Sequence, residues 1–333
     1  MASFEHIIGQ ENAIGALQAA IHGGKLAHAY LFAGPAGVGK YTTAIALAQL
    51  LNCTESTGCG QCLACEKIAN QTHPDVTTLR PDGRSIKIDA VRQLEELLAY
   101  APHEGRRRLV IIDEAEKLTL AAANAMLKSV EEPRSATVFI FVTGAAHQLV
   151  ATLRSRCQRL RFSPLSTQHT LEIVRRHDSS GEEIHGAAVA LAEGSPGRAL
   201  ELLASEQTGK AEEIGRNLLS AARSDTVAQI FAAAADAGRD RNILLDALRF
   251  VRVWLRDVLL AKEVGSDSAL IDNPNIEAFT RQLNADTTSQ RRILSQLRAV
   301  QAAHQALQAN ANPALTLETL MLNLRPMKAY DRR

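Results

Sequence analysis

A glycine-rich segment, GPAGVGK at residues 34–40, constrains the fold of this chain more than any other feature. It follows the apolar run AYLFAG and precedes TTAIALAQLL, which has a helical pattern. Glycines at this spacing, followed by lysine between a strand and a helix, form the phosphate-binding P-loop pattern. Backbone N–H groups and the helix N-terminus of such a loop surround phosphate oxygens. We therefore expect Gly34, Gly37, Gly39 and Lys40 to contact a nucleotide.

The residue after the lysine departs from this pattern. A P-loop has Ser or Thr there, and its hydroxyl coordinates Mg²⁺, but this chain has Tyr41. The phenol oxygen lies too far along its ring to take that position. Thr42 is a candidate nucleotide contact, although one more helical residue turns its side chain by about 100°. The sequence predicts a degenerate magnesium site, with ATP and Mg²⁺ binding left as an open alternative.

A second nucleotide-site pattern, LVIIDEAE, covers residues 109–116. An apolar strand that ends in two acids has the Walker B form, in which Asp113 would hold the magnesium shell and Glu114 would polarise water. The alternative is that the two acids only cap the helix that follows. The presence of a P-loop earlier in the chain favours the nucleotide site.

Four of the five cysteines lie within one short stretch, CTESTGCGQCLAC. Cys53, Cys59, Cys62 and Cys65 have the spacing Cx5CxxCxxC, which lets four thiolates surround one Zn²⁺ ion. A closed site of four protein ligands has no position for substrate, so the metal would be structural. An iron–sulfur cluster and free buried cysteines are the alternatives.

The first half of the chain alternates short apolar runs with helical patterns, which predicts βαβ units and a parallel sheet. Expected strands cover 29–34, 75–79, 107–113, 137–144 and 158–162, and expected helices cover 42–51, 88–100, 121–132 and 149–157. After Pro164 the strand signals end and only helical patterns follow. We expect an α/β P-loop domain at 1–164 with the cysteine insertion, a helical lid at 165–208 and an all-helical domain at 209–333.

The overall charge gives no sign of a nucleic-acid or membrane surface, because 37 basic residues balance 36 acidic ones. No run of about 18 apolar residues and no charged leader before an apolar core is present. These observations predict a cytoplasmic protein.

Two arginines raise the question of a role outside the chain's own site. Arg154 and Arg156, in TLRSRCQ, are either solvated helix residues or a source of positive charge for the γ-phosphate at a neighbouring subunit. Arg198, in GSPGRAL, is either a surface residue or a phosphate sensor. The residues alone leave both questions open.

Several segments together resemble bacterial DNA polymerase III clamp-loader subunits of the AAA+ class. They are IIGQENAI, HAYLFAGPAGVGK, the four-cysteine insertion, THPD, IDEAEKL, AANAMLKSVEEP and TLRSRCQ. The resemblance is strong from residue 4 to about 205, and in the helical tail it is limited to the general character and to WLRDVLLAK at 254–262. It implies a place in the polymerase holoenzyme used for DNA replication.

What the resemblance implies is a ring of five subunits that opens a sliding clamp and places it on primed DNA. The partners would be gamma/tau motor subunits and delta. Arg156, in the family's SRC sequence, would be an arginine finger offered in trans to a motor subunit, and Arg198 would match the second sensor. The tail at 209–333 would be the collar that holds the ring together.

The resemblance also includes two kinds of subunit, which differ in the magnesium position. Tyr41 favours the kind that binds nucleotide weakly or not at all and does not hydrolyse it. The alternative is a gamma/tau-type motor that hydrolyses ATP in cis through Lys40, Asp113 and Glu114. A stand-alone AAA+ remodelling enzyme is disfavoured by the cysteine insertion and the collar-like tail.

Overall fold

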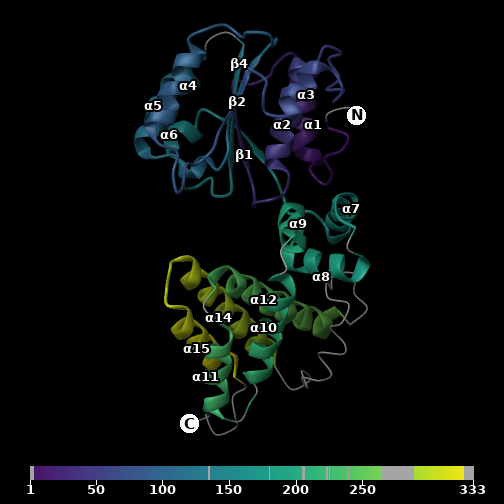
Figure 1. Ribbon diagram of the computed structural model, residues 1–333, viewed down its shortest axis with the longest axis vertical. Coiled ribbons are helices and arrows are strands. Elements are labelled where there is room, and N and C mark those ends of the chain that lie inside the picture. The colour runs from purple at the N-terminus through teal and green to yellow at the C-terminus, as the bar shows by residue number, and fades with distance from the viewer. Residues whose placement is uncertain are drawn as a thin grey trace. The chain divides into compact units, whose positions relative to one another are not determined.

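The computed structural model describes residues 4–133, 136–179, 181–204, 207–222, 224, 226–238, 240–264 and 289–325. The chain forms two compact units (Figure 1). The first comprises Met1–Ile173 with Gly194–Arg198, and the second comprises Val174–Glu193 with Ala199–Arg333. The expected lid helices are therefore divided between the two units, and the domain boundaries at 164 and 208 stay predictions.

The first unit is built on a sheet of five parallel strands in the order β2-β3-β4-β1-β5. The strands are β1 Ala29–Ala33, β2 Val76–Leu79, β3 Arg108–Ile112, β4 Thr137–Thr143 and β5 Gln158–Arg161. Every residue of β1, β3 and β4 is buried. These strands are apolar on both faces because helices cover both sides of a parallel sheet.

Helices flank the sheet on two sides (Figure 1). One side carries α1 Glu11–His22, α2 Lys40–Asn52 and α3 Leu63–Ala69, and the other carries α4 Ile88–Leu98, α5 Leu120–Glu131 and α6 Ala151–Arg154. Side chains alternate along β1, so Tyr30 and Phe32 enter the core under α1 and α2. Leu31 enters the second core, under α4 and α5. The α/β fold expected from the sequence is confirmed.

The predicted strands match the observed ones to within one or two residues, but the helix expected at 149–157 was too long. It covers only Ala151–Arg154. The amide of Arg156 donates to the carbonyl of Leu153, at 3.2 Å, so the chain tightens from α-helical into three-residue turns. These turns bring the chain out of α6 and into β5.

Asp75, at the entry to β2, holds the loop that leads into β3. Its buried carboxylate accepts backbone N–H bonds from His103 at 2.7 Å, Glu104 at 2.8 Å and Gly105 at 2.7 Å. Its other neighbour is the guanidinium of Arg108, whose Nη2 lies 3.4 Å away. Burial tends to raise the pKa of Asp75, but these donors outweigh it and lower the pKa.

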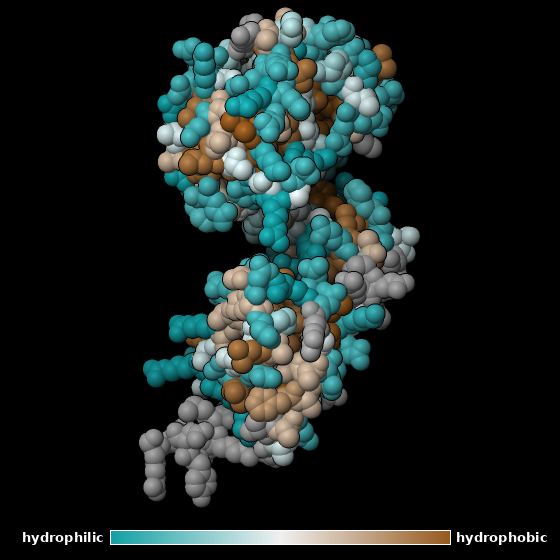
Figure 2. Space-filling model, turned by 60° about the vertical axis from the view of Figure 1, so that its left-hand side comes forward, coloured by the Kyte–Doolittle hydropathy of each residue, from teal (hydrophilic) through white to brown (hydrophobic). Residues whose placement is uncertain are grey.

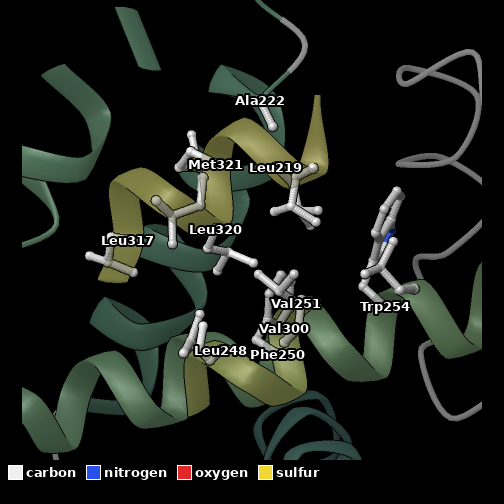
Figure 3. Packing of buried hydrophobic residues seen from close by; sticks show 14 of the residues in the cluster. Leu219, Ala222, Leu248, Phe250, Val251, Trp254, Val300, Leu317, Leu320 and Met321 are labelled. Carbon is white, nitrogen blue, oxygen red and sulfur yellow. The ribbon is translucent and has the colours of Figure 1, made fainter. Parts of the chain in front are cut away.

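The described residues of the second unit form helices and the loops that join them, with no strand among them. Helix α7 Thr167–His177 leads into it, followed by α8 Glu182–Ala192, α9 Pro196–Ala204, α10 Gln207–Ala221, α11 Val227–Asp236, α12 Arg241–Val264, α14 Gln290–Gln308 and α15 Pro313–Leu324. Side chains of α10, α12, α14 and α15 point toward one another in its core (Figure 3). Among the described residues, no helix combines the length and the hydropathy needed to cross a membrane.

Exposed surface on both units is largely hydrophilic in the view of Figure 2, with apolar side chains in scattered areas. The large exposed apolar side chains of the first unit are Leu63, Leu97, Tyr100 and Leu120. They come from three different helices and the loop after α4, and single exposed apolar residues of this kind are normal on proteins.

Candidate functional site

The loop between β1 and α2 has the backbone shape that its glycines permit. Gly37 and Gly39 adopt positive φ angles of 70° and 95°, a region that residues with a side chain rarely enter. A Cβ on Gly34 would collide with the carbonyl oxygen of Phe162, which follows β5. Gly34 therefore lets the chain after β5 lie directly against the start of the loop.

Lys40 is the first residue of α2, and it is buried with a relative exposure of 6%. Its Nζ donates to the carbonyl of Gly34, at 2.7 Å, and to that of Pro35. Burial lowers the pKa of Lys40, and the carboxylates of Asp113 and Glu116 partly offset this effect. The first N–H groups of α2 have no acceptor within the helix. An ammonium group and free amides at one helix start fit a polyphosphate.

The beginning of α9 is bonded to the same loop. The hydroxyl of Ser195 donates to the carbonyl of Ala36, at 2.9 Å, and the amide of Gly197 donates to that of Gly37, at 3.0 Å. The amide of Arg198 in turn donates to Ser195 Oγ, at 3.2 Å. The structure thus brings Arg198 next to the P-loop, far from it in sequence.

Asp113 and Glu114 follow β3, which is separated from β1 by β4. The Oδ1 of Asp113 accepts the amide of Glu114 at 3.1 Å, so this carboxylate supports its own turn. Glu114 has a φ of 52°, and its half-exposed carboxylate pairs with Lys117 at 2.5 Å. Glu116 accepts the amide of Gly144 at 3.1 Å, which ties the turn to the end of β4.

Tyr41 does not present its hydroxyl to the loop. The oxygen lies 3.5 Å from Thr78 Oγ1 on β2. The face of the ring carries the guanidinium of Arg80, whose carbon is 4.7 Å from the ring centroid. Arg80 Nε lies 3.5 Å from Asp113 Oδ2. Thr42, the other candidate, is exposed on α2. These residues fit a phosphate group but do not fit Mg²⁺ in the usual P-loop coordination.

Two residues of this site, Gln10 and Arg80, were not expected from the sequence. Gln10, buried before α1, donates through Nε2 to the carbonyls of Ser163 at 2.8 Å and Val38 at 3.2 Å. It ties the P-loop to the chain after β5, and no local pattern reveals that contact. Arg80 had a signal, because it directly follows a predicted strand of a parallel sheet, and ligands bind at the carboxyl ends of such strands.

The four clustered cysteines converge between α2 and α3. Their sulfur atoms all lie within 4.8 Å of one another. Cys53 Sγ is 3.6 Å from Cys59 Sγ and 3.9 Å from Cys62 Sγ. Four sulfurs at about 2.3 Å from a tetrahedral Zn²⁺ would be about 3.8 Å apart, so these separations fit zinc. The four residues are therefore close enough to hold a metal ion.

The backbone around the cluster favours ionised sulfur at Cys53. Burial opposes ionisation, but N–H groups of Cys59 and Thr57 outweigh it and lower the pKa of Cys53 to about 6. At Cys65, burial and the neighbouring sulfurs raise the pKa to about 12. Further thiolates beside the first are unfavourable without a cation, and a bound metal removes that cost.

Arg156 lies just before β5, at the amino end of a parallel strand. The P-loop follows the carboxyl end of the neighbouring strand β1, so the length of the sheet separates the two. Four strand residues span roughly 13 Å. Arg156 Nη1 donates to the carbonyl of Thr152, at 2.8 Å, and its Nε pairs with Glu131 of α5. The arginine is partly exposed, at 38% of its side chain.

The parallel sheet, the P-loop after β1, the acids after β3 and the strand between them define a P-loop domain of the AAA+ class. Within this class, residues 9–166 match the family model described as "DNA polymerase III, delta subunit". The match covers the α/β part of the chain and agrees with the resemblance found in the sequence.

Curated relatives include two kinds of DNA polymerase III subunit. The chain is 39% identical over 143 residues to subunit delta' of Bacillus subtilis, covering 42% of the chain and 44% of the relative. It is 36% identical over 191 residues to subunit delta' of Escherichia coli, covering 56% and 57%. It is 34% identical over 221 residues to subunit gamma/tau of Mycobacterium tuberculosis, covering 63% and 38%. The chain thus spans about half the length of these relatives.

Proposed function

We propose that this chain is a clamp-loader subunit of the delta' kind, a ring component that binds nucleotide weakly or not at all and does not hydrolyse it. The observation that carries the proposal is Tyr41, whose side chain replaces the magnesium-binding hydroxyl and is covered by Arg80. Without a coordinated metal, the γ-phosphate lacks the main charge that stabilises its transfer. The isolated protein should therefore show negligible magnesium-dependent ATP turnover.

The proposed activity lies in trans. Arg156 lies at the amino ends of the strands, whereas the chain's own P-loop lies at their carboxyl ends. We therefore expect Arg156 to serve a neighbouring motor subunit of the gamma/tau kind as an arginine finger. Glu131 holds the guanidinium at the surface until that contact forms. Together with gamma/tau and delta, the chain would form a hetero-pentameric ring in the cytoplasm that loads a sliding clamp on primed DNA.

The decisive experiment uses the reconstituted complex with Arg156→Ala. The variant should assemble normally but slow ATP turnover by the motor subunits, by about 10³ at the site it serves if the finger dominates there. Arg159→Ala is the matched control, because Arg159 is an exposed arginine on the adjacent strand β5. Normal ATP turnover and clamp loading by the Arg156→Ala complex would exclude the finger role.

A second candidate function is a motor ATPase of the gamma/tau kind. Lys40 and Asp113 are both present, and gamma/tau subunits are among the relatives. The same measurement separates the two functions. Turnover by the isolated chain at a rate comparable to the motor's, abolished by Lys40→Ala, would support the motor function and contradict the first proposal.

A further inference from the structure

Arg80 stands where the sheet brings three elements together. It follows β2, while Asp113 follows the adjacent strand β3, and the amide of Asp113 donates to the carbonyl of Leu79 at 2.9 Å. Tyr41 comes from the first turn of α2. The guanidinium therefore lies between the proposed metal-shell carboxylate and the side chain that replaces the metal-binding hydroxyl.

Three contacts position the guanidinium of Arg80, whose side chain is 48% exposed. Its Nε lies 3.5 Å from Asp113 Oδ2, its Cζ lies 4.7 Å from the centroid of the Tyr41 ring, and its Nη1 donates to Gln71 Oε1 at 3.2 Å. Within the described part of the chain, Nη2 donates to no acceptor. A guanidinium is always charged, and its fork of N–H groups matches phosphate oxygens.

The guanidinium of Arg80 is linked electrostatically, through Asp113, to the P-loop lysine. Asp113 is near enough to Lys40 to affect the lysine's ionisation, and it is also the partner of Arg80. One carboxylate thus acts electrostatically on both cations, as a Walker B carboxylate acts on the P-loop lysine and the metal. Arg80 supplies the second cation here.

We propose that Arg80 takes the place of the divalent cation at this nucleotide site, so that the chain binds a nucleoside polyphosphate without Mg²⁺. A tethered guanidinium attracts phosphate oxygens through charge and hydrogen bonds. It cannot coordinate water and both phosphates at the same time, as a metal ion does. The site would then hold nucleotide as a structural ligand. This inference deepens the proposed function and rests on it for the lack of hydrolysis.

The test measures ATP and ADP affinity of the full chain by isothermal titration calorimetry, in MgCl₂ and in EDTA. For the wild type, the two affinities should agree within about threefold. Arg80→Gln should weaken binding in EDTA by about tenfold or more, because the second cation is lost. Arg84→Gln is the matched control, since Arg84 is an exposed arginine a few residues further along. It should leave binding unchanged.

A second measurement follows the metal itself. With Mn²⁺ as the probe, electron paramagnetic resonance should show no more bound ion with wild-type protein and ATP than with ATP alone. The double variant Arg80→Gln, Tyr41→Thr should regain bound Mn²⁺ and a dependence of affinity on metal. Circular dichroism of each variant confirms that it is folded.

Three results would overturn the inference. They are wild-type binding that requires Mg²⁺, binding in EDTA that Arg80→Gln leaves unchanged, and absence of nucleotide binding in either solution. None of them affects the Arg156→Ala test, which reads ATP turnover by the partner subunit. Failure of this inference is therefore distinguishable from failure of the proposed function.

Discussion

At the scale of single residues, the four clustered cysteines show how local chemistry and local backbone act together. Cys53 ends α2 and Cys62 precedes α3, so the helices fix two of the sulfur atoms. Gly58 and Gly60, with φ angles of 65° and 72°, let the chain turn back between them. Because the chain turns back here, four ligands from one short segment can surround a tetrahedral metal ion.

We predict that Cys62→Ser releases zinc. Three thiolates bind the ion more weakly than four, and the segment from 53 to 75 should loosen. Atomic absorption should show about one zinc per wild-type chain and near zero in the variant. The control is Cys157→Ser, because Cys157 lies outside the cluster and its thiol only donates to the carbonyl of Leu153. Unchanged metal content in Cys62→Ser would refute the zinc assignment.

At the scale of elements, the loop between α4 and β3 depends on one carboxylate. The Asp75 side chain is fully buried, and that of Arg108 is 9% exposed. Arg108 also donates to the carbonyls of Tyr100 at 2.8 Å and Ala101 at 2.9 Å. Buried charges of this kind are stable only when each partner is present. The loop is therefore locked to the amino ends of two neighbouring strands.

We predict that Asp75→Asn destabilises the first unit by about 3–5 kcal/mol, because Arg108 is left as an uncompensated buried charge. Urea unfolding followed by circular dichroism measures the loss. Asp89→Asn is the control, since Asp89 is 76% exposed and its pair with Arg92 should contribute at most about 1 kcal/mol. Equal stability of the two variants would contradict this account of the loop.

The same carboxylate gives the fold a pH dependence of known sign. The pKa of Asp75 is lowered in the folded protein, so its stabilisation is fully present above the unfolded value of about 3.9. It is lost as the pH falls through the lower folded value. Wild type should therefore lose stability below about pH 4 more steeply than Asp75→Asn. If the free energy of unfolding of the two proteins fell with the same slope below pH 4, this mechanism would be wrong.

Most strands and helices could be predicted from the sequence, because local residue patterns determine these elements. The predicted strands and most helix positions follow from apolar runs and their periodicity, which the local backbone repeat sets. The length of α6 was not predictable, since the turn at Arg156 depends on where β5 must begin. Helix α3 was also missed, because the cysteines hide its apolar pattern.

At the scale of the whole molecule, the helical unit has its own apolar core. Trp254, the chain's single tryptophan, is buried on α12 among residues of the neighbouring helices (Figure 3). The arginines of α12 are largely paired rather than free, since Arg249 contacts Asp246 and Arg252 contacts Glu193. Over the described part of α12, these acidic partners offset the basic charge of the arginines.

We predict that a chain lacking residues 210–333 fails to enter the clamp-loader complex. The expected collar contacts would be lost, and so would most of the core packed against α8 and α9. Size-exclusion chromatography with gamma/tau and delta measures incorporation. Retained zinc and circular dichroism of the truncated chain show whether the first unit stays folded. Full incorporation of that chain would contradict the collar role.

Taken alone, the sequence determined the P-loop, the acids after an apolar strand, the cysteine cluster and the parallel α/β class. Each of these is a local pattern whose spacing reflects the backbone geometry of one element. Only the tertiary structure decided that Arg80 covers Tyr41 beside Asp113, that α9 is bonded to the P-loop, and that Arg156 lies at the end of the strands opposite the P-loop. Those relations depend on strand pairing and on contacts between segments distant in the chain, which no local spacing records.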